Sequence, residues 1–151
     1  MPEIGERAPD FTLPGTEGLF TLSQVSPGRK VVLAFYQEDS TPSCTTQLSA
    51  FKEEFPTLQQ LGATVIGVSA DSLDSHQRFC DQQQGFPFPL MSDPELVVAR
   101  AYDVVGEDDK RSRRAVYVID EQGVIVHKIP WYQPGNAAQF MEVFQALGLE
   151  S

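Results

Sequence analysis

The chain has few of the features that mark secreted, membrane-spanning or nucleic-acid-binding proteins. Only two of its 151 residues are cysteine, too few for a disulfide scaffold. Lysine and arginine number 11 against 21 aspartate and glutamate, and the formal net charge of -10 disfavours binding to nucleic acid or to anionic membranes. The longest apolar run, Val31 to Tyr36, is far shorter than the roughly 20 residues that cross a bilayer. We therefore expect neither a nucleic-acid nor a membrane partner.

The first ten residues and the overall organisation of the chain also lack special features. The first ten residues, MPEIGERAPD, lack the basic and then apolar stretches of a signal peptide, so we expect a cytoplasmic protein. In that compartment the two cysteines would cycle between redox states rather than form a permanent bridge. We find no repeat, low-complexity tract or long linker. The sequence therefore predicts a single domain over residues 1–151.

Apolar patterning predicts alternating strands and helices after an amino-terminal extension rich in proline and glycine. Continuous apolar runs predict strands, and apolar residues at spacings of three and four predict helices. The expected strands are 31–36, 64–68, 115–119 and 124–129, the last two forming an antiparallel hairpin. The expected helices are 43–61 with a break at Pro56, 72–84, 93–102, and a last one that Gly148 ends. This order predicts an α/β fold, a thioredoxin-like three-layer sandwich whose mixed central sheet has helices on both faces.

The most informative segment is FYQEDSTPSCTT, residues 35–46, where a buried strand leads through a short polar loop into a helix. Cys44 falls in the first turn of that helix. Free backbone N–H groups and the positive end of the helix dipole stabilise a thiolate at such a position, and the thiolate is the nucleophilic form. Cys44 is therefore a candidate nucleophile, and the alternative is a small buried cysteine that only packs.

The segment around Cys44 resembles the peroxiredoxins, whose signature at this junction is P-x-x-x-T-x-x-C. Thr41 and Cys44 match its last two fixed positions, whereas Gln37 stands where the family has proline. The similarity extends from Gly5 and the segment APDFTL (8–13) to Arg114 and Asp120, and is greatest to the bacterioferritin comigratory protein or PrxQ-type branch. The resemblance implies a thiol-dependent peroxidase that acts on hydrogen peroxide and small alkyl hydroperoxides, without cofactor or metal.

The same resemblance implies roles for side chains around the nucleophile. In-line attack on a peroxide needs hydrogen-bond donors around both oxygens, and the family places them on Thr41, Arg114 and the loop backbone at Ser43. Arg114 would supply a fixed cation that stabilises the thiolate and the transition state. Arg111 and Arg113 are alternatives, and the spacing to Asp120 favours Arg114. Gln37, in place of the proline that shields the thiolate, would shape the same pocket.

After attack, the sulfenic acid on Cys44 needs a second thiol. Many PrxQ-type proteins carry it five residues later, where this chain has Ser49, and others carry it on the next long helix, where this chain has Cys80. The resemblance thus implies an intramolecular Cys44–Cys80 disulfide and local unwinding of one or both helices. Cys80 could instead be a core residue on the stripe of Phe79. His76, four residues before Cys80, would favour its thiolate or simply pack.

Other readings remain open at this stage. The pair His76 and Cys80 has metal-ligand spacing, but neither Cys44 nor His127 brings a second nearby ligand, so zinc is a weak alternative. A one-cysteine peroxidase with an external resolving thiol and a non-catalytic thioredoxin-fold redox-sensing module are the rivals. Trp131 and Tyr132 would line the pocket or a partner surface, or anchor a loop. The family implies a thioredoxin or glutaredoxin-like reductant, and we expect a monomer.

Overall fold

Two apolar segments form the centre of the sheet in this computed structural model, which describes residues 2–25 and 28–149. They are β3 (Lys30–Phe35) and β4 (Ala63–Ser69), and they pair in parallel. Side chains of a strand alternate between its two faces, so Val32 and Ala34 enter one apolar cluster while Val31 and Leu33 enter the other. A strand that serves two cores must be apolar throughout, which explains the continuous run in the sequence.

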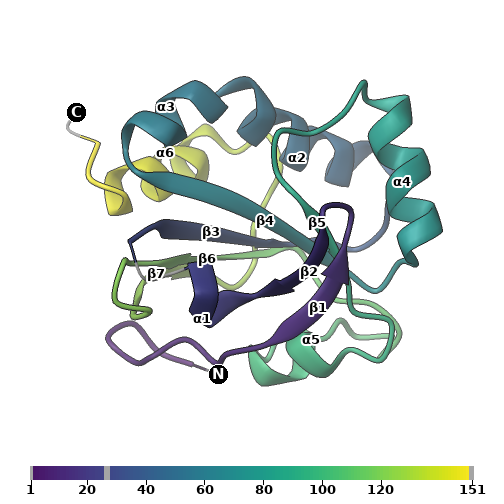
Figure 1. The fold of residues 1–151 in the computed structure, drawn as a ribbon, viewed down its shortest axis with the longest axis horizontal. Helices are drawn as coiled ribbons and strands as arrows, with labels where there is room; N and C mark the ends of the chain where they lie inside the picture. Colours follow the sequence, from purple (N-terminus) through teal and green to yellow (C-terminus); the bar gives the residue numbers. More distant parts are fainter. Residues whose placement is uncertain (1, 26–27, 150–151) are drawn as a thin grey trace.

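The sheet has seven strands in the order β2-β1-β5-β4-β3-β6-β7 (Figure 1). The remaining strands are β1 (Thr12–Gly15), β2 (Gly18–Thr21), β5 (Leu90–Ser92), β6 (Ala115–Ile119) and β7 (Ile125–Ile129). β5 is parallel to β4, whereas β6 is antiparallel to β3 and β7 to β6. The expected mixed sheet and its terminal hairpin are therefore confirmed.

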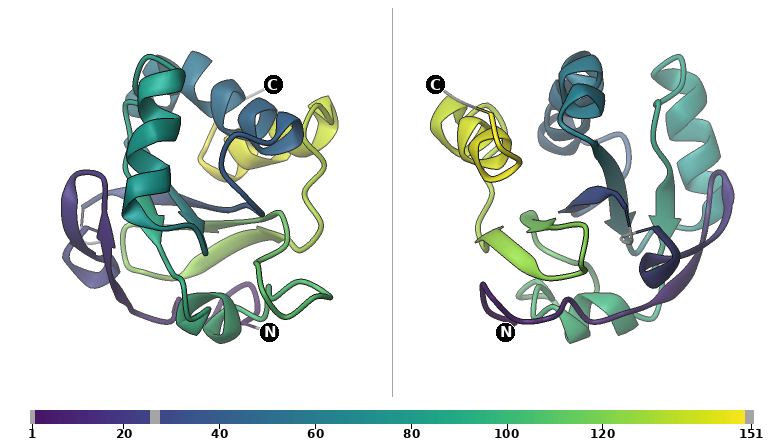
Figure 2. Two further views of the ribbon diagram at one scale, coloured as in Figure 1. Left: turned by 90° about the vertical axis from the view of Figure 1, so that its right-hand side faces the viewer. Right: turned by 60° about the vertical axis from the view of Figure 1, so that its left-hand side comes forward.

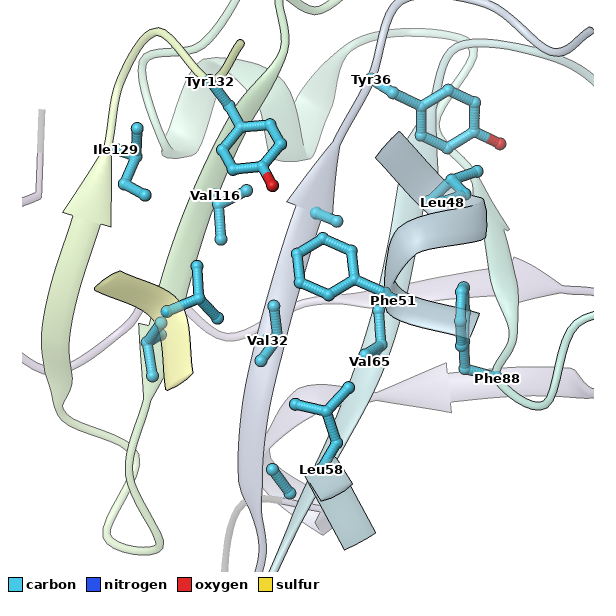
Figure 3. Close-up of a cluster of buried hydrophobic side chains, with 14 of the residues drawn as sticks. Val32, Tyr36, Leu48, Phe51, Leu58, Val65, Phe88, Val116, Ile129 and Tyr132 are labelled. Carbon is cyan, nitrogen blue, oxygen red and sulfur yellow. The ribbon is translucent and has the colours of Figure 1, made fainter. Parts of the chain in front are cut away.

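Helices cover both faces of the sheet. They are α1 (Leu22–Val25), α2 (Pro42–Glu53), α3 (Phe55–Gln60), α4 (Leu73–Gln82), α5 (Val97–Ala101) and α6 (Ala137–Ala146). One cluster packs α2, α3, α4 and α6 against the sheet, and the other packs α1 and α5 on the opposite face, an arrangement visible in Figure 2. In the first cluster Phe51 stacks on Tyr132 with ring centroids 6.3 Å apart (Figure 3). The Phe51 ring also packs against Phe140, with centroids 5.3 Å apart. The layered α/β architecture agrees with the sequence.

Several boundaries differ from those expected. The predicted helix 93–102 begins only at Val97, because Leu96 adopts a left-handed conformation (φ 59°) and breaks the turn that starts at Asp93. Asp93 accepts hydrogen bonds from the Val98 and Ala99 amides and so caps the helix from outside it. The amino-terminal extension is not irregular: β1 and β2 form a hairpin that joins the edge of the sheet through Gly15 and Met91.

Among the described residues, no helix is long and apolar enough to span a membrane.

Candidate active site

Cys44 lies in the first turn of α2, which follows β3 after the short loop 36–41. Thr41 precedes the helix in an extended conformation, Pro42 opens it, and the Thr45 amide donates to the Thr41 carbonyl at 2.9 Å. The first backbone N–H groups of a helix have no carbonyl within the helix, so those near Cys44 are available to an anion. Gln47, one turn later, donates to the Phe35 carbonyl at 3.2 Å and fixes α2 to the strand.

The Cys44 side chain is fully buried, with 0% of its surface exposed, and belongs to the apolar cluster under α2. Both cysteines are free thiols. A nucleophile so enclosed is shielded from bulky reagents, and the surrounding chain must move to admit even a small oxidant. Cys44 thus combines burial with the helix-start position that the sequence predicts.

Thr41 and Ser43 occupy the loop and the helix start as expected, but Thr41 uses its proton locally. Its hydroxyl donates to the Glu38 carbonyl at 2.9 Å. The Thr41 oxygen therefore remains as an acceptor toward a ligand, whereas the sequence led us to expect a group that donates to the peroxide or accepts from it. Ser43 is exposed, so its contribution to a ligand site rests on its backbone N–H.

Arg114 reaches the same loop from the start of β6. Its Nη1 donates to Gln37 Oε1 at 2.8 Å, and its Nε is buried with no hydrogen-bond partner among residues 2–25 and 28–149. A buried guanidinium N–H without an acceptor is costly, so an anionic or peroxide oxygen would satisfy it. Gln37, exposed at the position where the resembled family has proline, thus binds the arginine directly.

The two other candidate arginines have their donors occupied elsewhere. Arg111 is exposed and pairs with Glu38 and Asp108, each at 3.0 Å. Arg113 donates to the Pro130 and Asp103 carbonyls, and its guanidinium lies 4.3 Å from the centre of the Trp131 ring. Among the three candidate arginines, Arg114 therefore differs in having a buried Nε that binds no other described residue.

A cleft of about 260 Å³ opens beside Gln37 and is walled by Trp131. The Trp131 side chain is 60% exposed, whereas Tyr132 is buried in the core, and its amide donates to the Arg114 carbonyl at 2.9 Å. Tyr132 therefore anchors the loop, whereas Trp131 lines a cleft whose walls include Gln37 but not Cys44, Thr41 or Arg114, so its place in the catalytic pocket stays a prediction.

Cys80 lies on α4, half-buried against the same apolar cluster as Cys44. Burial, and next the negative charges of Asp39 and Asp81, raise the pKa of its thiol above the ordinary value. The net shift favours the thiol over the thiolate, and the suggested effect of His76 on Cys80 stays a prediction. His76 is fully buried in contact with Asp39 and the Met91 carbonyl.

The structure also bears on the zinc alternative and on residues that the sequence did not single out. Both ring nitrogens of His76 already have hydrogen-bond partners, so it presents no free lone pair to a metal.

Asp39, Asp71 and His76 place their polar atoms within 4.8 Å of one another. Asp39 carries no sequence signal, because its partners Ser75 and His76 lie far along the chain.

A thioredoxin-like sheet has a buried cysteine at the strand-to-helix junction, and the loop before that cysteine binds an arginine whose Nε has no partner among the described residues. These features define a thiol-dependent oxidoreductase. Comparison with protein families matches residues 4–128 to the AhpC/TSA family, so the chain belongs to that family. Its relatives are peroxiredoxins of the Bcp and PrxQ type, which confirms the resemblance seen in the sequence and makes the chain a thiol-dependent peroxidase.

Three relatives illustrate the match. The chain is 39% identical over 129 residues to the peroxiredoxin bcp of Coxiella burnetii, with 82% of this chain and 85% of the relative covered. It is 35% identical over 130 residues to peroxiredoxin Bcp of Bacillus subtilis, with 82% of each covered. The crystal structure of a mutant PrxQ from Xylella fastidiosa superimposes with a TM-score of 0.84 at 30% identity, over 97% of both chains.

Proposed function

We propose that the protein reduces hydrogen peroxide and small alkyl hydroperoxides through Cys44. The observation that carries the proposal is the position of this buried thiol at the start of α2, after a loop in which Gln37 binds Arg114. In the first step the Cys44 thiolate attacks one peroxide oxygen, the O–O bond breaks, and the other oxygen leaves as an alcohol or water after taking a proton. Cys44 becomes a sulfenic acid, oxidised by two electrons.

Side chains and backbone N–H groups of the site orient the peroxide and stabilise the negative charge that develops in this step. The Thr41 oxygen accepts the peroxide O–H, because its own proton is held by the Glu38 carbonyl. The buried Nε of Arg114 donates to the oxygens that become negative, and the backbone N–H groups of Ser43 and Cys44 face the same charge. Gln37 holds the guanidinium at the edge of the site.

Cys80 resolves the sulfenic acid in the second step. Its thiol displaces water from the Cys44 sulfenic acid to give an intramolecular disulfide, so the sulfenic oxygen leaves with two protons. The Cα atoms of a disulfide lie within about 7 Å. Because Cys44 is enclosed on α2 and Cys80 is on the separate helix α4, one or both helices unwind locally for the bond to form. The alternative is a one-cysteine cycle in which an external thiol takes the place of Cys80.

A dithiol donor of the thioredoxin or glutaredoxin-like class then reduces the disulfide, and its own two thiols become a disulfide. All electrons pass through sulfur, so the cycle uses neither a bound metal nor an organic cofactor. We propose that residues 1–151 work as one unit, as a monomer in the cytoplasm, in keeping with the acidity of the chain.

The proposal is tested by adding one equivalent of hydrogen peroxide to the fully reduced protein and measuring intact mass and peptide maps without reductant. We expect loss of two hydrogens and a Cys44–Cys80 cross-link. A gain of one oxygen on Cys44 with Cys80 free would replace Cys80 by an external thiol. A Cys44 thiol that reacts no faster than Cys80 with micromolar peroxide would favour the non-catalytic module and contradict the proposed activity.

A further inference from the structure

The loop that leads to Cys44 and the helix that carries Cys80 meet in a buried polar group of side chains: Tyr36, Asp39, Ser75 and His76, here named the Asp39 cluster. Asp39 lies in the loop and is 8% exposed. Its Oδ1 accepts from the Tyr36 hydroxyl at 2.6 Å, and its Oδ2 accepts from Ser75 Oγ at 2.8 Å and lies 2.8 Å from His76 Nδ1. Figure 3 shows the Tyr36 hydroxyl directed away from the other labelled side chains. This is the hydroxyl that donates to Asp39.

The geometry of His76 assigns a proton to each of its ring nitrogens. Nε2 lies 2.9 Å from the Met91 carbonyl, which can only accept, so Nε2 carries a proton. Nδ1 faces the Asp39 carboxylate, so a second proton lies between these two atoms. The result is a contact, buried on both sides, in which one proton joins His76 Nδ1 to Asp39 Oδ2. Losing one member of a buried pair leaves the other without compensation, so the contact holds the two segments together.

Two further contacts join the Cys44 segment to the far end of α4. Ser40, adjacent to Thr41, donates to Gln82 Oε1 at 2.8 Å, and Lys52 on α2 donates to the Gln83 carbonyl at 2.6 Å. The Asp39 cluster binds the first turn of α4, so this helix is fastened at both ends. Cys80 lies between the fastened ends, so these contacts oppose any movement of Cys80 toward Cys44.

We propose that Asp39 and His76 are positioning residues that hold the loop before Cys44 in the form that reacts with peroxide, and that their contact must break before Cys80 attacks. The inference rests on the proposed function, because it assigns the order of the two steps. According to this inference, the Asp39 cluster has opposite effects on the oxidation of Cys44 and on the formation of the disulfide. Weakening the contact slows oxidation of Cys44, which needs the ordered loop, and accelerates disulfide formation, which needs α4 to be released.

The experiment separates the two rates by rapid quenching with a thiol-alkylating reagent and mass spectrometry of thiol, sulfenic acid and disulfide. Asp39→Ala removes the contact. We expect Cys44 oxidation to slow about tenfold and conversion of sulfenic acid to disulfide to accelerate about tenfold, each equal to about 1.4 kcal/mol. Asp39→Asn retains a neutral hydrogen bond to a singly protonated His76, so its rates should lie between those of Asp39→Ala and the unchanged protein.

Asp93→Ala is the matched control. Asp93 is also a buried carboxylate, 2% exposed, but its hydrogen bonds are to amides of α5 on the opposite face of the sheet. We expect this variant to lose stability while both rates remain unchanged. Parallel slowing of both steps in Asp39→Ala, the same divergence in Asp93→Ala, or no gain from Asp39→Asn over Asp39→Ala would overturn the inference.

Failure of the proposed function is distinguishable from failure of the inference. If the unchanged protein forms no Cys44–Cys80 disulfide, Cys80 loses its proposed role, and the cluster is judged on Cys44 oxidation alone, where an unaltered rate in Asp39→Ala refutes it. Nitrogen-15 spectra of the reduced, unaltered protein give a measurement that needs no variant. We expect protons on both ring nitrogens of His76, and a single protonated nitrogen would contradict the shared proton.

Discussion

Removing Arg114 should slow peroxide reduction far more than removing the exposed Arg111. In the reduced protein Nη1 of Arg114 is bound to Gln37 and Nε is buried without a partner among the described residues, so the N–H that would face the reacting oxygens is on Nε. A hydrogen bond to a charged group contributes about 1.5–3 kcal/mol. At about 1.4 kcal/mol for each factor of ten, its loss from the transition state corresponds to roughly a 10- to 150-fold slower reaction.

Arg114→Ala and Arg114→Lys separate charge from geometry. Lysine retains the cation but not the planar fork, so it should recover part of the rate. The assay is the second-order rate constant of the reduced enzyme in competition with a reporter peroxidase, together with the thiolate fraction from ultraviolet absorbance against pH. Arg111→Ala is the control, since its side chain is 49% exposed and its ion pairs are on the surface. An equal or larger loss in Arg111→Ala would show that Arg114 is the wrong arginine.

Four further outcomes are expected. Cys44→Ser should abolish peroxidase activity, and turnover near that of the unchanged protein would contradict the mechanism. Gln37→Pro should leave the rate equal or higher, because it frees Nη1 of Arg114 for the site, and a large loss would show that Gln37 has a role of its own. In a Cys44→Ser background, alkylation of Cys80 should still accelerate above pH 9.0, because the raised pKa keeps the thiol protonated there, and a plateau below that pH would refute the assignment. Phe51→Ala should lower the free energy of unfolding by about 3–5 kcal/mol in urea titrations, because Phe51 is fully buried between Tyr132 and Phe140, and a loss below about 1 kcal/mol would mean that the cavity refills.

The sequence predicts the centre of the fold better than its edges, for a physical reason. β3 and β4 are buried on both faces, and that burial forces an apolar run that can be read directly. β5 has three residues, and β1 contains Pro14, so neither has a strand signal of its own. Their place depends on pairing across the sheet edge. The left-handed Leu96 likewise follows from tertiary packing, not from the local pattern.

Some residues of the candidate site could likewise be predicted from the sequence, and others could not. The strand-to-helix position of Cys44 follows from local patterning, and family resemblance adds Thr41 and Arg114. The Asp39 cluster could not be predicted, because its members come from the segment after β3 and from the first turn of α4, which are neighbours only in the folded protein. A buried polar contact of this kind has no periodicity that a sequence displays. Its partners become visible only when the parallel pairing of β3 and β4 brings their carboxyl ends together.

The cleft beside Gln37 gives this protein an optical reporter of its own. The chain contains one tryptophan, Trp131, and that residue forms a wall of the cleft with the Arg113 guanidinium over its ring. Indole emission depends on neighbouring charge and hydration, so light from a single, known position will register any rearrangement next to Gln37 during turnover. The catalytic cycle can therefore be followed in stopped flow without attaching a dye or introducing a third cysteine.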